Sequence, residues 1–450
     1  MSTKENSLGT ESIFKLLISL SVPAILGQII NALYNIVDRM FIGHIEGVGA
    51  VALTGVGVTF PIIILITAFS SLIGMGGAPK AAIKMGEGRN DQAEKILGNS
   101  VVLLIIISII LTVLFIVYKE PLLYMFGASD ETIVYANEYL NIYLLGTIFV
   151  QLSLGLNPFI NTQGFSKISM ITVLIGAVLN IILDPILIFG FGMGVKGAAI
   201  ATVISQAVSA IWVLKFLNGK KTLLKIKKVN FKVEKEIIIP VMLLGLSPFI
   251  MQSTESLVNI VFNSTLQRYG GDNAVGAMTI ASSIMQVFTM PLLGLTQGAQ
   301  PIVSYNFGAK NLDRVKKTFK LLLLFSMGIS IVLWALLMIF PSIFIGVFTS
   351  DESLKQLSIW AIRIYMATIF VMGAQFACQQ TFLALGQAKI SLFLAVLRKI
   401  ILLIPLVLIL PKKLNLFGVF LSEPIADTIA VTVTVISFAI FYRKTLNKSI

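Results

Sequence analysis

The fold of this chain is decided by apolar stretches such as residues 101–118, which read VVLLIIISIILTVLFIVY and carry no acidic or basic side chain. Residues 400–410 form another uncharged run. Such runs, with their flanks, approach the roughly 20 residues that cross the hydrocarbon core of a membrane. Backbone groups find no water there, so a span must be a helix or a closed barrel, and these runs lack the alternation of barrel strands. The sequence therefore predicts an all-α membrane protein.

The composition of the whole chain agrees with this prediction. Of its 450 residues, 56% are hydrophobic and 12% are charged, whereas about a quarter of the residues in a soluble domain are charged. A soluble core cannot bury so much apolar chain, so the bilayer must be its solvent.

The apolar runs predict twelve transmembrane helices. They are expected near residues 12–41, 47–75, 92–118, 132–162, 168–189, 196–217, 236–268, 273–302, 314–340, 353–385, 389–410 and 415–442.

The net charge of +13 raises two alternatives, nucleic-acid binding and membrane topology. Basic residues concentrate in the connections that an inside N-terminus places in the cytoplasm: Lys80, Lys84, Arg89 and Lys95; residues 215–235; residues 310–320; and Arg443, Lys444 and Lys448. This pattern follows the positive-inside rule, so we expect both termini in the cytoplasm, contact with membrane lipid and no nucleic-acid partner. We further expect a monomer in the plasma (inner) membrane, inserted by a first apolar segment too long for a cleaved signal.

The chain matches itself at an offset of 222 residues. Pro79 aligns with Pro301, and residues 164–169, GFSKIS, align with residues 386–391, GQAKIS. An even number of spans separates the copies, so they share one orientation, which predicts two pseudo-symmetric six-helix lobes with a cavity between them. The predicted domains are an N-lobe at residues 1–217, a basic cytoplasmic linker at residues 218–235 and a C-lobe at residues 236–450.

Two intramembrane acids are predicted at one depth in the N-lobe. A charge at mid-membrane costs about 3 kcal/mol, so Asp38 and Asp184 require an explanation. With Thr202, they are expected roughly 7 to 9 Å below the outer surface. Burial and like charge both disfavour ionisation, which describes a proton site, and added Asn and Thr oxygens would suit Na⁺ equally. The alternative is a hydrogen-bond cluster that only holds the helices together.

Helical spacing gathers further polar residues onto the same stripes. Asn180 lies four residues before Asp184, and Asn31 and Tyr34 precede Asp38 at intervals of three and four. Pro23 and Pro185 each remove a backbone hydrogen bond, so either can supply a bend coupled to protonation or a static kink.

The C-lobe carries its own polar stripe, in which Gln252, Glu255 and Asn259 follow helical spacing. Glu255 is a candidate for a cationic substrate, a coupling ion or a structural hydrogen bond. Met285 and neighbouring Met and Phe residues would give a cavity adaptable walls, or serve as plain packing.

A group of four charges is also expected in the C-lobe. Glu423 and Asp427 are spaced to face Arg398 and Lys399, which favours structural ion pairs over a second transport site.

Little in the sequence points to enzymatic chemistry. Residues 192–197 match G-x-G-x-x-G, but they follow a membrane run without a βαβ unit, which favours a loop. His44 is expected in an outer loop, Cys378 in packing, and a Walker A motif is absent. We therefore expect no catalytic residues, no cofactor and no metal other than a coupling ion.

The chain resembles the multidrug and toxic compound extrusion (MATE) transporters, nearest their prokaryotic DinF-like branch. The resemblance rests on residues 179–190, LNIILDPILIFG, on residues 34–38, YNIVD, and on the paired loops at Gly164 and Gly386. It implies twelve helices in two lobes and drug efflux driven by H⁺ or Na⁺.

The resemblance also implies site residues. It assigns Asp38, Asn180, Asp184 and Thr202 to cation coupling, with Tyr139 beside them. It assigns Asn31, Tyr34 and Asn157 to the N-lobe cavity. Glu255 resembles the helix 7 acid of the NorM-type branch, whereas residues 353–387 lack that branch's helix 10 acid.

Three hypotheses follow. The leading one is an antiporter that exports cationic or amphipathic small molecules in exchange for H⁺ or Na⁺. The second is a flippase or exporter of a lipid-linked or other amphipathic metabolite, which predicts a more basic cavity. The third is an integral-membrane enzyme or receptor, for which the chain lacks an evident nucleophile, base or metal cluster.

Overall fold

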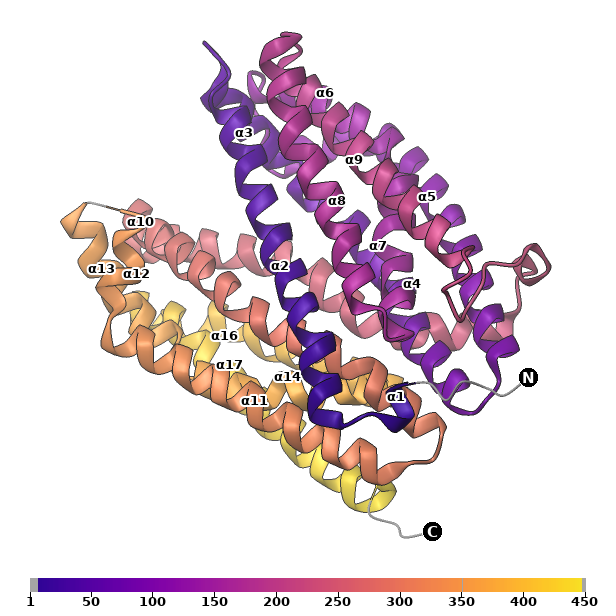
Figure 1. Cartoon of the computed structure of the whole chain (residues 1–450). Helices are drawn as coiled ribbons and strands as arrows, with labels where there is room; N and C mark the ends of the chain where they lie inside the picture. Colours follow the sequence, from indigo (N-terminus) through magenta and orange to yellow (C-terminus); the bar gives the residue numbers. More distant parts are fainter. Residues whose placement is uncertain (1–6, 350, 447–450) are drawn as a thin grey trace. The chain divides into compact units, whose positions relative to one another are not determined.

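A computed structural model describes residues 7–349 and 351–446, so Lys448 of the predicted basic clusters lies outside the described residues. The described chain is helical and contains no strand (Figure 1). Its first half comprises α1 (Ser7–Thr10), α2 (Ile13–Gly43), α3 (Gly49–Val58), α4 (Phe60–Gly86), α5 (Asn90–Met125), α6 (Thr132–Leu145), α7 (Thr147–Thr162), α8 (Ser166–Pro185), the π-helix η1 (Ile186–Gly190) and α9 (Gly194–Leu217).

The second half begins after the short 3₁₀ helix η2. Its helices are η2 (Lys228–Phe231), α10 (Lys235–Gly308), α11 (Leu312–Ile339), α12 (Pro341–Gly346), α13 (Glu352–Tyr365), α14 (Ile369–Ala384), α15 (Ala388–Val396), the π-helix η3 (Leu397–Leu403), α16 (Ile404–Ile409), α17 (Pro411–Phe441) and the π-helix η4 (Tyr442–Leu446).

The predicted twelve spans are confirmed. Nine helical segments of the described chain are long and apolar enough to cross a membrane. Two bent pairs add two spans, because α6 with α7 (59°) and α13 with α14 (48°) pass the same test together. The twelfth span comes from α10, where Gly271 has φ 65° and ψ −164° and separates two helices. This break falls between the predicted spans 236–268 and 273–302, at a conformation that glycine adopts without steric cost.

Only the first part of the G-x-G-x-x-G segment forms the predicted loop. Gly192 and Met193 join η1 to α9, which begins at Gly194, and both of these glycines have positive φ angles. The single cysteine, Cys378, is buried as expected.

Contacts divide the chain into two compact units. One unit contains Val22–Phe249, and the other contains Met1–Ser21 with Ile250–Ile450. The division therefore differs from the predicted repeat boundaries, because the start of α2 packs with the C-terminal unit and the start of α10 packs with the N-terminal unit. In both helices the change of unit occurs within two residues of a proline, Pro23 or Pro248.

Two glycines, 222 residues apart, make equivalent contacts in the two units. Gly76 on α4 lies against the backbone of Val241 and Gly245 on α10. Gly298 on α10 lies against the backbone of Ser21 on α2. Small residues allow helix backbones to approach closely in membrane bundles, so the internal repeat preserves a packing contact as well as a topology.

The basic linker is docked on the N-terminal unit. The buried side-chain oxygen of Gln163 accepts hydrogen bonds from Leu223 N (2.7 Å) and Leu224 N (2.9 Å). Asn99 Oδ1 accepts from Glu234 N at 2.9 Å, and Glu94 pairs with Lys227. Polar side chains of the helices therefore satisfy the linker backbone.

We predict that Gly298→Ala destabilises the protein, whereas Gly328→Ala does not. A Cβ at position 298 would lie 2.5 Å from Ser21 Cα, while a Cβ at position 328 meets nothing within 4 Å. Overpacking should cost about 1–3 kcal/mol in the first variant, and the gain in helix propensity should leave the second equal or more stable. Thermal unfolding in detergent measures both, and equal melting temperatures would contradict the assigned packing.

Candidate functional site

The N-terminal unit contains a buried polar cluster built by four helices. Asn180 and Asp184 lie on α8 and Thr202 lies on α9, and their exposed fractions are 1%, 0% and 8%. Asn180 Nδ2 donates to Asp184 Oδ1 at 3.2 Å and lies 3.4 Å from Thr202 Oγ1. The predicted i, i+4 relation of Asn180 and Asp184 thus places both on one interior face of α8.

Asp38 joins this cluster from α2. Its carboxyl group is a direct neighbour of the Asp184 carboxyl group. One oxygen of each acid, Asp38 Oδ1 and Asp184 Oδ2, is buried without a hydrogen-bond partner, as is Asn180 Oδ1. The structure therefore brings the two predicted acids together and leaves three oxygen atoms available to a positive ion.

Tyrosines and an arginine complete the surroundings of the two acids. Tyr139 on α6 interacts through its hydroxyl with Thr202 and stacks on Tyr143, with ring centroids 6.0 Å apart. Arg39 lies near Asp38, but its guanidinium sits over the Phe60 ring at 4.2 Å. Among the described residues it forms no ion pair with either acid, so the two carboxyl groups have no paired basic residue.

Sequence reasoning missed Arg39 and Tyr143 at this site. Tyr143 lies four residues after Tyr139 and aligns with Tyr365 in the repeat, so helical spacing was the available signal. Arg39 directly follows the predicted Asp38. Its contact with Phe60 joins two different helices, so no pattern along the sequence indicates it.

A cavity adjoins the cluster within the same unit. The cavity has a volume of about 40 Å³, which is enough for a few water molecules. Its wall includes the predicted residues Asn31, Tyr34 and Asn157, together with Asn180 and Thr202 of the cluster. Asn157 Oδ1 is buried without a partner while its amide donates to Ser169 O. The wall also contains Ser153, Thr172, Ser205, Gln206 and Ser209, which were not predicted.

The cluster has the donor set of a small hard cation. Carboxylate, amide and hydroxyl oxygens are the ligands that such cations prefer, and a carboxyl pair can instead hold a proton. No group of three or more His, Cys, Asp or Glu residues suited to a metal occurs in the described chain.

The two predicted bend residues differ in their surroundings. Pro185 ends α8 and is followed directly by the π-helix η1, so the helix that carries Asp184 changes its winding at the site. Pro23 lies inside α2, which remains helical from Ile13 to Gly43. It stands where the chain passes from one unit to the other.

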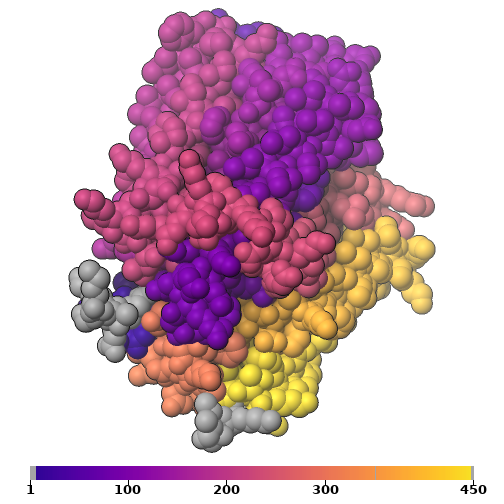
Figure 2. Space-filling model, turned by 90° about the vertical axis from the view of Figure 1, so that its right-hand side faces the viewer, coloured from indigo at the N-terminus to yellow at the C-terminus, as the bar shows by residue number. Residues whose placement is uncertain are grey.

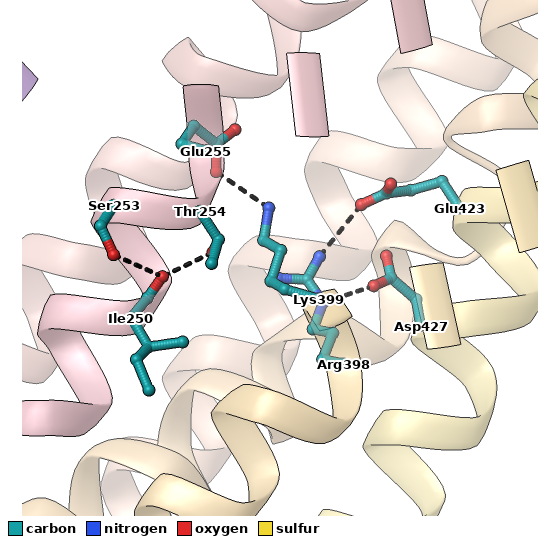
Figure 3. A network of polar contacts seen from close by, with 8 residues as sticks. All are labelled: Ile250, Ser253, Thr254, Glu255, Arg398, Lys399, Glu423 and Asp427. Atoms are coloured by element: carbon teal, nitrogen blue, oxygen red, sulfur yellow. Dashed lines mark hydrogen bonds and ion pairs between the residues drawn. The ribbon is translucent and has the colours of Figure 1, made fainter. Parts of the chain in front are cut away.

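The C-terminal unit contains a network of charges on three elements (Figure 3). Arg398 bridges two acids of α17, at 3.2 Å to Glu423 and 2.7 Å to Asp427. Lys399, the next residue of η3, pairs with Glu255 of α10 at 2.9 Å. The predicted ion pairs of Arg398 with Glu423 and Asp427 are thus confirmed. Lys399 pairs with Glu255 instead of with these two acids.

The other predicted C-lobe residues, Gln252, Asn259 and Met285, also lie on α10. Met285 packs against the buried apolar core of the C-terminal unit, which is the packing alternative for that residue. Asn259 is exposed and Gln252 is partly buried.

Fold and site together define a class: a polytopic helical membrane protein with charged groups in its interior, which is an arrangement typical of transporters. The profile of the MatE family matches residues 23–186 and 248–409. The chain belongs to this family, the MATE transporters, so it is a transporter and not an enzyme.

Individual relatives extend over almost the whole chain. A protein of Staphylococcus haemolyticus named multidrug export protein MepA is 27% identical over 439 residues, covering 97% of this chain and 96% of the relative. A MATE protein solved in complex with MaL6 is similar at a TM-score of 0.91 with 25% identity and full coverage of both chains. A MATE structure in the bent conformation gives 0.92, with 25% identity and coverage of 100% and 99%.

We predict that Arg398→Met strongly destabilises the protein, whereas Arg268→Met has little effect. Removing Arg398 leaves two buried acids without their partner, which costs about 3–5 kcal/mol in buried pairs, while Arg268 forms no ion pair among the described residues and is exposed. Thermal unfolding of purified variants measures the difference. An Arg398→Met variant as stable as the wild type would contradict the structural role of the bridge.

Proposed function

We propose that this MATE transporter exports multiple cationic or amphipathic small molecules by antiport with H⁺ or Na⁺. The supporting observation is the pair of neighbouring acids, the half-buried Asp38 and the buried Asp184, each of which has one buried oxygen without a hydrogen-bond partner, as does Asn180. The name of the MepA relatives, multidrug export protein, supports the substrate breadth. In this proposal Asp38, Asn180, Asp184 and Thr202 bind the coupling ion, with Tyr139 beside them.

Electrostatics gives the order of events in the proposed exchange. Two neighbouring carboxyl groups in a low-dielectric interior favour binding of one positive ion. An ion that enters from outside neutralises the pair, and a cationic substrate bound beside it, for which the cavity must widen, then loses its attraction and leaves. Release of the ion to the cytoplasm restores the negative charge, which favours the next substrate. Bending at Pro23 or Pro185 would change the cavity as the ion binds.

The described cavity favours this function over a flippase for lipid-linked molecules. A lipid headgroup with phosphate would require basic residues, whereas the described cavity wall consists of neutral polar and apolar side chains. We therefore retain cation antiport as the proposed activity.

We also propose a cellular setting. The chain is a multi-pass membrane protein, and its basic connections favour the plasma (inner) membrane with both termini in the cytoplasm. A monomer in contact with membrane lipid, without a nucleic-acid partner or cofactor, completes the proposal.

We predict that Asp38→Asn abolishes gradient-driven efflux. The amide cannot exchange a proton and holds a cation less strongly, so the coupling ion is lost while the helix remains intact. Dye efflux from everted vesicles under separately imposed pH and Na⁺ gradients measures the effect and identifies the ion. Asp313→Asn is the matched control, because this side chain is 94% exposed. Undiminished efflux in Asp38→Asn would contradict the assigned site.

We predict that the variant Lys228→Cys is labelled by a membrane-impermeant maleimide only after the cells are permeabilised. The variant His44→Cys should be labelled in intact cells. Cys378 is buried and should contribute little background. The reverse labelling pattern would contradict the proposed orientation.

A further inference from the structure

The charge network of the C-terminal unit contains one more negative than positive group. Three carboxyl groups, on Glu255, Glu423 and Asp427, are paired with only Arg398 and Lys399 among the described residues. The remaining titratable group that faces them is Tyr365 of α13. A surplus charge in a membrane interior is costly, so the network must take up one positive ion to become neutral.

The surplus negative charge lies in the more deeply buried part of the network. The side chains of Arg398, Glu423 and Asp427 are 12%, 5% and 2% exposed, and together these three groups carry one net negative charge. Glu255 and Lys399 form a neutral pair on the other side. Charge neutrality therefore requires a proton on the Glu423/Asp427 pair as long as Lys399 stays with Glu255.

The two ends of the Glu255 pair differ in access. The Glu255 side chain is 49% exposed, whereas that of Lys399 is 10% exposed. Glu255 therefore has uncovered surface that a second cationic group can approach, whereas Lys399 is almost enclosed by protein. The lysine ammonium therefore occupies the position that a monovalent cationic group would take.

Lys399 directly follows Arg398, which binds Glu423 and Asp427, and its own side chain projects between α10 and α17 to Glu255 (Figure 3). A lysine is a compact charge on a flexible four-carbon stem, so its ammonium can be redirected by rotation of the side chain. Arg398, which forms two charge-assisted bonds, is held in place by contrast.

We propose that Lys399 is a tethered cation that couples the binding of one cationic substrate group at Glu255 to the release of one proton from the Glu423/Asp427 pair. When the substrate cation takes Glu255, Lys399 moves to the Glu423/Asp427 pair. The O–H bond of the protonated carboxyl group breaks, its proton passes to water and the carboxylate remains. Both states have the same net charge, so the exchange is electroneutral within the unit.

This inference deepens the proposed export of cations and rests on it, but the two are tested at different residues. The probe is tetraphenylphosphonium, a permanent monovalent cation that carries no proton of its own. The purified full chain in sodium-free, weakly buffered detergent solution is mixed with the probe. A pH-indicator dye counts released protons, and equilibrium dialysis measures affinity.

We expect Glu423→Gln to reduce proton release by about one per bound cation and to weaken binding by about tenfold. The neutral amide leaves Arg398 paired with Asp427 and leaves no proton to release and no partner for Lys399. Asp427→Asn should act in the same way, which provides a second variant if one folds poorly. Glu352→Gln is the control, because that acid is 68% exposed on α13 of the same unit.

The measurement is repeated with Asp38→Asn and Asp184→Asn combined, which removes the N-lobe ion site. About one proton per bound cation should remain in this background and disappear on adding Glu423→Gln. Proton release that Glu423→Gln leaves unchanged, or a wild-type protein that binds no probe, would overturn the inference. A loss of efflux in Asp38→Asn is independent of these outcomes, so failure of the N-lobe proposal would be recognised separately.

Discussion

The interior of this protein is organised by the cost of an uncompensated charge away from water. The bilayer forces every span to be helical, and it forces each charged side chain inside the bundle to find a partner or a mobile ion. Arg398 meets this requirement with two acids, and Lys399 meets it with Glu255. Asp38 and Asp184 form no ion pair within the described chain, which is why we propose their site for the transported ion.

The two units compensate their interior charges in different ways, although their sequences repeat. The repeat preserves backbone features: Gly164 and Gly386 both adopt positive φ, and Gly76 and Gly298 both admit a neighbouring backbone. It does not preserve the polar sites, because the position 222 residues after Asp184 is Leu406. The helical scaffold is therefore duplicated, but the polar sites differ. Among the described residues, the two acids of the N-terminal unit have no basic partner, whereas the acids of the C-terminal network are paired with Arg398 and Lys399.

Much of the fold followed from hydrophobicity alone. The spans were predicted because an apolar run of membrane length has one compatible structure, and even the break at Gly271 lay between two predicted helices. The cluster of Asp38, Asn180, Asp184 and Thr202 could be predicted in part, since spacing along one helix fixes which residues share a face.

What could not be predicted depends on how helices rotate and exchange partners. Adjacent residues of a helix point in different directions, so the sequence showed that Arg398 and Lys399 could both form ion pairs but not that Lys399 would pair with Glu255. The packing of residues before Val22 with the C-terminal unit is likewise a long-range contact. The domain boundaries read from the repeat therefore differ from those drawn by contacts.

In the proposed mechanism the carboxyl pair of Asp38 and Asp184 holds an exchangeable positive ion. Infrared difference spectroscopy of the purified full chain in sodium-free solution observes a protonated carboxyl group directly. We expect protonated-carboxyl absorption that is stronger in the wild type than in the variant combining Asp38→Asn and Asp184→Asn, which keeps only the proton of the Glu423/Asp427 pair. This difference should diminish when the solution is made alkaline. Identical spectra for the wild type and the double variant at every pH would contradict it.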